Sequence, residues 1–387
     1  MQFAHSEEQQ LIRENARSLL AERAGSAQLR AAMEQPGGYD AQLWRQISAE
    51  LGWSGLAIPQ AYGGAGLGWV ELCILQEELG RRLVPSPFFA TAALAAPIID
   101  ALGSEAQRRM LLQSIAAGEL RIACSLSGTD GRPPCAGVTA LLESSGDGFT
   151  LNGVSDFVIH GDTADELLVL ARSSGSSGSS GISVVVVPAR SAGVTVRPHV
   201  MLDVTRPMSR VEFAAVRVGA GRLLGEHGAA GAALERALNL ARIALASEAL
   251  GGAEQVLEMT SAYVKQRVQF GRPIGSFQAV KHRLADMMIE VEAAKSAAWY
   301  AACVAQERSE ELAEAAAIAK SYCCDTFFDC AANAIQLHGG IGFTWEHEAH
   351  LYFKRARATA MLLGSPAWQR ERLVRLFAPG EAATPFF

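Results

Sequence analysis

The chain has 387 residues and a formal net charge of −6, from 34 Lys and Arg against 40 Asp and Glu. Hydrophobic residues make up 49% of it and charged residues 19%, which is the composition of a globular protein and not of a disordered one. The negative charge argues against a general nucleic-acid binder, because such binding depends on neutralising phosphates. The length suggests two or three domains and enough buried surface to fold without disulfides or a metal.

Neither the start of the chain nor its seven cysteines indicate an exported or membrane protein. The first residues lack the basic and apolar regions of a secretory signal. The longest apolar stretch, 88–99, contains Pro97 and is too short to cross a bilayer. The cysteines show no zinc-ribbon spacing, so we expect reduced, buried thiols in a cytoplasmic protein.

The first 120 residues have a helical pattern. Apolar residues recur at helical spacing in 12–20, and the same character returns in 40–51 and 72–83. A glycine-rich loop is predicted between these two segments, at 58–68.

Residues 121–222 have a β pattern instead. Short β-branched runs at 166–171, 182–187 and 211–218 predict strands. Leu151-Asn-Gly is expected to turn between two further strands, and the Ser/Gly-rich segment 173–181 to form the tip of a hairpin.

From residue 223 the pattern is helical again. A very long helix is predicted to run to Arg267, followed by helices over 277–307 and 311–337, and helices of this length pack as a bundle. The order of helices, strands and helices is not a βαβ alternation, so a Rossmann fold and a TIM barrel are excluded. We therefore predict an α+β chain with a helical domain at 1–120, a β domain at 121–222 and a helical bundle at 223–387.

Several familiar motifs are missing from the sequence, namely GxGxxG, Walker A and GxSxG. His347-Glu-Ala-His350 resembles a zinc motif, but its histidines are three residues apart instead of four. The polar start of a helix is the favoured interpretation of that segment, and no metal site is predicted.

Two glycine-rich helix ends are more informative. At 267–278, Arg267 and the start of a new helix at Phe277-Gln278 suit an anionic group, although simple capping of a helical hairpin explains them equally well. At 336–345, a helix ends at Gly339-Gly340, where the backbone can approach a ligand closely. A plain glycine C-cap is the alternative there, with Gln336 a polar residue in the last turn.

These two segments carry a resemblance to the acyl-CoA dehydrogenase family, through Gln-Phe-Gly-Arg-Pro-Ile-Gly-Ser-Phe-Gln-Ala at 269–279 and His-Gly-Gly-Ile-Gly-Phe at 338–343. Ser-Glu-Glu-Gln near the start and Pro-Gln-Ala-Tyr-Gly-Gly at 59–64 match as well, so the resemblance covers essentially the full chain. Thr344-Trp-Glu-His is typical of the actinobacterial type, whose members often act on bulky substrates such as steroid side-chain thioesters.

The resemblance implies an N-terminal helical domain, a central β domain, a C-terminal four-helix bundle and FAD held between subunits. It also implies α,β-desaturation of an acyl-CoA thioester, in which a carboxylate removes the α-proton and a hydride passes from the β-carbon to the flavin. An electron-acceptor flavoprotein is an expected partner. The residues at cofactor-contacting positions of the family are Arg267, Phe270, Phe277, Gln278, Gln336, Gly339, Gly340, Ser125 and Phe157.

Both positions at which the family carries its catalytic base hold residues that cannot take a proton. In one branch the base is a Glu before a Gly-Thr pair near the C-terminus, and that position is Leu363. In another branch it precedes an Arg on the long helix, and that position is Ala241. The Arg itself is kept as Arg242, which the resemblance marks as substrate-binding. The catalytic base is therefore unknown.

The β domain departs from the family as well. The segment 124–133 stands where the family has a Thr-Glu-Pro loop that holds the flavin ring, and only Ser125 in it resembles a family position. Phe157 replaces the Trp that flanks the ring.

In the family, one subunit supplies that loop, the ring-flanking strand and the base. Its neighbour supplies the Arg-x-x-Phe-Gly and Gln-x-x-Gly-Gly segments, which grip the ADP half of FAD. This chain keeps the second set and has lost the first. We therefore expect a supporting subunit of an α2β2 heteromer with a second acyl-CoA dehydrogenase-like chain, with a homo-oligomer as the alternative.

Other hypotheses stay open. An FAD- or FMN-dependent monooxygenase of the same fold needs no carboxylate, because it activates oxygen, and a catalytically silent scaffold needs no base at all. Another acid could replace the base, but Glu248 is about two turns from Ala241, and Glu346 and Glu348 suit a solvated or capping role better.

Overall fold

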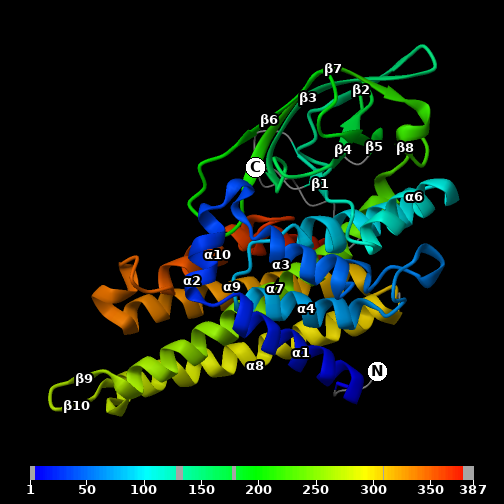
Figure 1. The fold of residues 1–387 in the computed structure, drawn as a ribbon. Helices are drawn as coiled ribbons and strands as arrows, with labels where there is room; N and C mark the ends of the chain where they lie inside the picture. The colour runs from blue at the N-terminus through cyan, green and yellow to red at the C-terminus, as the bar shows by residue number, and fades with distance from the viewer. Residues whose placement is uncertain (1–4, 128–133, 177–179, 308, 378–387) are drawn as a thin grey trace. The chain divides into compact units, whose positions relative to one another are not determined.

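The computed structural model describes residues 5–127, 134–176, 180–307 and 309–377 (Figure 1). They form two compact units. The first unit draws its described residues from 1–27, 73–84 and 242–387, and the second from 28–72 and 85–241.

The second unit contains a sheet of eight strands within the described residues. The strands are β1 (Ile122–Ser125), β2 (Leu141–Ser145), β3 (Gly148–Ile159), β4 (Glu166–Arg172), β5 (Ile182–Pro188), β6 (Val194–Pro198), β7 (Met208–Gly219) and β8 (Leu223–Leu224). Their order is β6-β7-β3-β2-β4-β5-β8, and β1 pairs in parallel with β4. The strands predicted at 166–171, 182–187 and 211–218 are confirmed, while the tip predicted at 173–181 lies partly outside the described residues.

The apolar runs of β4 and β5 are buried along nearly their whole length. They share a core with side chains of β3 and β7, among them Leu151, Val158 and Phe213. Continuous burial of β-branched residues accounts for the runs that the sequence shows without alternation.

The prediction of a turn at Leu151-Asn-Gly is wrong. The three residues continue β3, whose antiparallel register with β7 slips between Leu151 and Gly153. Gly153 has a φ of +146°, and a Cβ atom there would lie 2.5 Å from the Cα of Ala140. A bulge with a close strand contact needs glycine because it requires a positive φ and leaves no room for a Cβ atom. A tight turn has the same requirement, so a glycine in the sequence does not distinguish the two.

The second unit also contains helices, most of which precede the strands of the sheet in the sequence. These are α2 (Ser26–Glu34), α3 (Ala41–Arg45), η2 (Gln46–Glu50), η5 (Phe89–Ala95), α5 (Ala96–Leu102) and α6 (Glu105–Ala116), with single turns η1 (Pro36–Gly38), η3 (Trp53–Gly55), η4 (Gln60–Tyr62) and η6 (Ala220–Arg222). Ser104 opens α6 with a capping box, in which its hydroxyl accepts from Gln107 N at 3.3 Å and its own N–H donates to Gln107 Oε1 at 2.8 Å.

The first unit is helical. Its helices are α1 (Glu7–Arg23), most of α4 (Trp69–Arg81), most of α7 (Gly231–Gln266), α8 (Gln278–Glu307), α9 (Leu312–His338), α10 (Ala349–Met361) and α11 (Pro366–Phe377), with the turns η7 (Ile274–Ser276) and η8 (Gly339–Phe343) and the two-residue strands β9 (Val268–Gln269) and β10 (Arg272–Pro273). The three long helices predicted after residue 223 are confirmed to within a residue at their predicted ends. α9 packs against α8, α10 and α11, which makes it the central helix of the bundle.

Two glycines bring α4 and α7 into backbone contact. A Cβ atom at Gly80 would lie 2.1 Å from the carbonyl oxygen of Glu248, and one at Gly251 would lie 1.9 Å from that of Glu77. Only glycine allows helices to approach this closely.

The arrangement confirms the predicted α+β class, with helices, then strands, then long helices along the chain. The domain boundaries at 120 and 222 stay a prediction. In the described part of the chain, no helix is both long and apolar enough to span a bilayer.

Candidate functional site

The connection between α7 and α8 forms one side of the candidate site. α7 ends at Gln266, and β9 and β10 pair as a short hairpin that protrudes beyond the two helices (Figure 1). Phe270 and Gly271 both have positive φ values, +56° and +76°, and make the tip. The helix therefore ends one residue before Arg267, its predicted end, and the two left-handed residues form a hairpin tip instead of a C-cap.

Aromatic and cationic groups gather on this hairpin. The Phe270 side chain is 91% exposed, and its ring centroid lies 6.1 Å from that of Phe277. The guanidinium of Arg272 lies 4.0 Å from the centroid of the Phe277 ring. The sequence interpretation missed Arg272, although its position between two glycine-containing turns could have signalled it.

The connection between α7 and α8 is rich in exposed cations. Between Glu258 and Asp286 the sequence contains no acid, but it contains the exposed cations Lys265, Arg267, Arg272, Lys281 and Arg283. Two of them lie in the first two turns of α8, where the helix dipole also favours an anion.

The end of α9 lies close to this connection. The Tyr263 hydroxyl donates to the His338 carbonyl at 3.2 Å, and the two rings stack with centroids 4.3 Å apart. Burial lowers the pKa of His338, and its Nδ1 lies 2.7 Å from the Ala334 carbonyl. Tyr263 is one helical turn before Arg267, so the stacked rings join the two predicted cofactor segments.

The glycines after His338 are not needed for packing within the chain. Gly339 has a φ of +64° and caps α9, which is the alternative that the sequence left open, and a Cβ atom at Gly339 or Gly340 would meet nothing within 4 Å. Gln336 is exposed one turn earlier. This region therefore offers a set of hydrogen-bond donors, which consists of exposed amides, guanidinium groups, the backbone at the open glycines and the start of α8. Such a set fits the diphosphate half of a dinucleotide such as FAD.

The first position for a catalytic base lies in the turn after α10. Leu363 is 6% exposed and has a left-handed φ of +56°. Its carbonyl accepts hydrogen bonds from Arg242 Nε at 3.1 Å and from Gln369 Nε2 at 3.0 Å. Ala241, the second position, is fully buried.

Arg242 uses its side chain inside the bundle. It is fully buried, and its guanidinium lies 5.3 Å from the centroid of the Trp368 ring as well as on the Leu363 carbonyl. The role of Arg242 in binding a substrate stays a prediction.

Glu248, one candidate for a substitute base, is engaged in an ion pair. Its Oε1 lies 3.0 Å from Nη1 of Arg355, with both side chains buried, and its Oε2 accepts from Gln76 at 3.3 Å. Both oxygens of this carboxylate are therefore engaged within the bundle by Arg355 and Gln76. Glu346 is exposed and Glu348 half-buried, and both precede α10.

The ring-flanking position lies in the second unit. Phe157 sits in a second bulge of β3 with a φ of +59°, its side chain is 44% exposed, and its ring stacks on His199 with centroids 5.4 Å apart. Asp156 accepts from Arg210 Nη1 at 3.0 Å and lies 2.9 Å from His199 Nε2. The sequence interpretation missed His199 and Arg210, because residues 43 and 54 positions from Asp156 meet it only in the folded domain.

Ser125 is buried at the end of β1. Most of the segment that follows it, 128–133, lies outside the described residues. The prediction that this segment lacks the flavin-holding loop of the family rests on its sequence alone.

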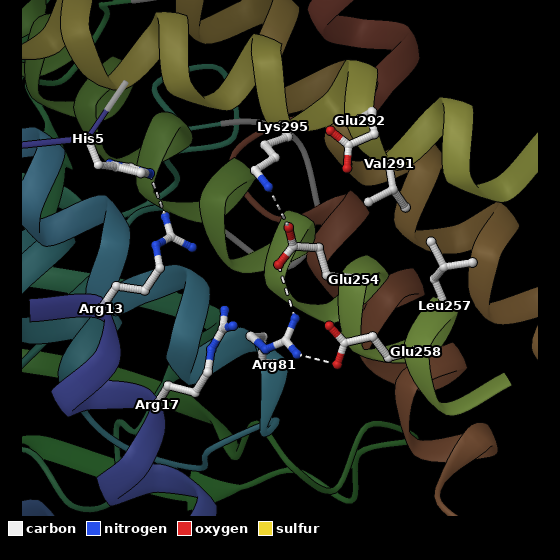
Figure 2. Close-up of a pocket in the computed structure, with 10 residues that line it drawn as sticks. All are labelled: His5, Arg13, Arg17, Arg81, Glu254, Leu257, Glu258, Val291, Glu292 and Lys295. Atoms are coloured by element: carbon white, nitrogen blue, oxygen red, sulfur yellow. Dashed lines mark hydrogen bonds and ion pairs between the residues drawn. The ribbon is translucent and has the colours of Figure 1, made fainter. Parts of the chain in front are cut away.

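A cleft of about 360 Å³ in the first unit is a structural feature with none of the predicted site residues (Figure 2). Cations and acids alternate along it. Arg81 lies 3.0 Å from Glu254 and also contacts Glu258, and Lys295 lies 3.7 Å from Glu254. Because Arg81 and Lys295 pair with acids of α7, the cleft contains an ion network that joins helices α4, α7 and α8.

The thiols and acids of the described residues offer no metal site. No group of three or more His, Cys, Asp or Glu side chains there could hold an ion. None of the seven cysteines, all of which lie in the described residues, forms a disulfide, and all except Cys135 are buried, as predicted. Burial raises the pKa of Cys124 and of Cys323, so neither is a ready nucleophile.

Two models of one family match the chain. The model of the acyl-CoA dehydrogenase N-terminal domain matches residues 6–119, and that of the acyl-CoA dehydrogenase C-terminal domain matches 211–377.

Curated relatives match over almost the full length. Acyl-CoA dehydrogenase IpdE2 from Mycobacterium tuberculosis is 36% identical over 370 residues, which cover 96% of each chain. IpdE2 from Mycolicibacterium smegmatis is 32% identical, over 95% of this chain and 98% of that one.

Solved structures are similar as well. A steroid acyl-CoA dehydrogenase, Tcur3481-Tcur3483, is 33% identical with a TM-score of 0.87, over 97% of this chain and 99% of that one. The ChsE4-ChsE5 complex from Mycobacterium tuberculosis is 27% identical with a TM-score of 0.87, over 98% and 99%. Butyryl-CoA dehydrogenase from Megasphaera elsdenii is 28% identical with a TM-score of 0.90, over 97% and 100%.

Proposed function

The chain belongs to the acyl-CoA dehydrogenase family of FAD-dependent oxidoreductases, and we propose that it is the subunit of a heteromeric dehydrogenase that does not supply the catalytic base. One observation carries this proposal. Leu363 and Ala241, at the two positions of the base, are apolar and buried, whereas the dinucleotide end around Arg267 and Gly339 is exposed and basic.

In this proposal the chain completes a cofactor site that it shares with a partner. Arg267 and Arg272 neutralise the diphosphate of FAD, Gln278 and Gln336 donate amide hydrogen bonds, and the open glycines 339 and 340 let the backbone approach. FAD, when bound, supplies the acceptor for the hydride that leaves the β-carbon of the acyl group. In the proposed site Phe270 and Phe277 cover the nucleotide. Ser125 and Phe157 stand at the positions that contact the flavin ring in the family.

The substrate class and the partners follow from the relatives. IpdE2 is an acyl-CoA dehydrogenase, the Tcur3481-Tcur3483 protein is a steroid dehydrogenase, and ChsE4-ChsE5 is a complex of two different chains. We propose the CoA thioester of a bulky, steroid-like acyl group as the substrate and a second acyl-CoA dehydrogenase-like chain as the partner in an α2β2 assembly. An electron-transferring flavoprotein, the subject of another similar structure, is the proposed electron acceptor.

The visible absorbance spectrum tests this proposal. The chain is purified alone and after co-expression with the dehydrogenase-like chain encoded nearest to it. We expect a colourless lone chain and a yellow complex with one FAD per pair of chains, bleached by an acyl-CoA. A lone chain that is yellow with one FAD per subunit contradicts the proposal. Oxygen uptake by the reduced complex, without bleaching by any acyl-CoA, would indicate monooxygenase chemistry instead.

A further inference from the structure

Lys320 is a charged side chain enclosed by the helical bundle. It lies in the middle of α9 and is 0% exposed, which places it among the largest fully buried side chains of the described residues. A buried ammonium group is costly unless its donors are satisfied, so its hydrogen bonds indicate what it stabilises.

Its hydrogen bonds go to the end of one helix and the turn beyond it. Nζ donates to the carbonyl oxygens of Thr359 at 3.1 Å and Ala360 at 3.2 Å, and to Cys324 Sγ at 3.3 Å. A longer contact, 3.5 Å, reaches the Gly364 carbonyl. Helix α10 ends at Met361, so Lys320 places a positive charge on carbonyls of its last turn and on the negative end of its dipole.

The turn beyond α10 has a backbone conformation that its residues do not favour. Leu363 has a φ of +56°, in the left-handed region where a leucine costs about 1–2 kcal/mol, and Gly364 follows with +101°. A conformation of this kind persists only where the surroundings over-determine it.

Three fully buried donors surround this turn. Arg242 from α7 and Gln369 from α11 donate to the Leu363 carbonyl, and Lys320 from α9 reaches the carbonyls on either side of it. We name these three residues the turn clamp. Lys320 differs from the other two because it is the member that bonds both to the helix end and to the turn.

We propose that Lys320 is the positioning residue of the turn 361–364, and that it holds residue 363 in its left-handed conformation. The bearing of this turn on an acyl site rests on the proposed function, whereas the clamp is tested without it. The clamp bonds only to backbone carbonyls of this segment. It therefore fixes the backbone at 363 independently of the side chain there, which in this chain is the apolar one of Leu363.

A double-mutant cycle tests the clamp in the full chain. Lys320→Met removes the donors with little change in volume, and Leu363→Gly removes the left-handed strain, because glycine adopts that conformation freely. We expect Lys320→Met to lower the melting temperature by about 3 °C in the Leu363 background and by less than about half of that in the Leu363→Gly background. Thr260→Val is the matched control, since it deletes a buried side-chain bond of 2.7 Å to Val256 in the same bundle.

Trp368 gives a second readout, which general loss of stability does not change. A Cβ atom at Gly364 would lie 2.3 Å from Trp368 Cε3, so the indole ring lies directly against the turn. The fluorescence of Trp368 is obtained by subtracting the spectrum of the Trp368→Phe variant. Lys320→Met is expected to shift this emission while the far-UV circular dichroism spectrum stays that of the native protein. Thr260→Val should leave that emission unchanged.

Equal losses in both backgrounds, or an unchanged Trp368 emission, would overturn the clamp. If coupling is found but the complex binds no FAD, the proposed function fails and the clamp stands. If FAD binds as expected but no coupling is found, the clamp fails and the proposed function stands.

Discussion

The close crossing of α4 and α7 makes Gly251→Ala a sharp test of the bundle. The added Cβ atom would lie 1.9 Å from the carbonyl oxygen of Glu77 and 2.7 Å from its carbonyl carbon. Both atoms belong to backbone and cannot rotate away, so the helices must separate by more than about 1 Å to reach van der Waals distance.

The expected loss follows from two opposing terms. Overpacking of a rigid contact costs about 1–3 kcal/mol, and the upper end applies because no side chain can yield. Alanine recovers about 1 kcal/mol of helix propensity over glycine. The net loss is about 2 kcal/mol, which lowers the melting temperature of a chain of this size by about 2–3 °C.

Urea unfolding followed by far-UV circular dichroism measures this difference. Gly340→Ala is the control, since a Cβ atom there meets nothing within 4 Å, and its effect should stay within about 0.5 kcal/mol. If Gly251→Ala stabilises the protein, helix propensity dominates and the reasoning on the α4–α7 contact is refuted.

Three further predictions follow from the charged and buried groups. Arg267→Ala should weaken FAD binding by the assembled complex about 10–100-fold, since a guanidinium–phosphate bond contributes about 1.5–3 kcal/mol. Arg109→Ala on α6 is the control and should not change FAD binding. Equal effects of the two variants in a fluorescence titration would contradict this prediction. Burial raises the pKa of Glu77 to about 7, above its unfolded value, so the folded state binds the proton more strongly. The unfolding free energy of the wild type, relative to Glu77→Gln, should therefore fall by about 3 kcal/mol as the pH rises from about 4.5 to 7, and parallel pH curves would contradict the shift. In the folded chain Cys135, the one half-buried thiol, should react first with a chromophoric disulfide, and all seven should react in urea; rapid labelling of several thiols before unfolding would contradict the buried core.

The sequence by itself determined the elements and marked the segments that are proposed to bind the cofactor. Long apolar periodicities fixed the helices α7, α8 and α9, and β-branched runs fixed β4 and β5, because these signals depend on neighbours along the chain. Gly339 and Arg267 were predicted from short motifs for the same reason. The apolar residues Leu363 and Ala241, on which the proposed lack of a catalytic base rests, are evident without any coordinates.

Only the tertiary structure decided how distant groups meet. Glycine signals turns and bulges alike, so Gly153 had to be placed against Ala140 before the predicted turn could be rejected. The sequence marked Glu248 as a candidate acid, but its pairing with Arg355, 107 residues away, is a property of the folded bundle. The same holds for Lys320, whose burial and carbonyl partners arise where α9 meets the end of α10. Electrostatics and strain depend on distance in space, which a linear pattern does not contain.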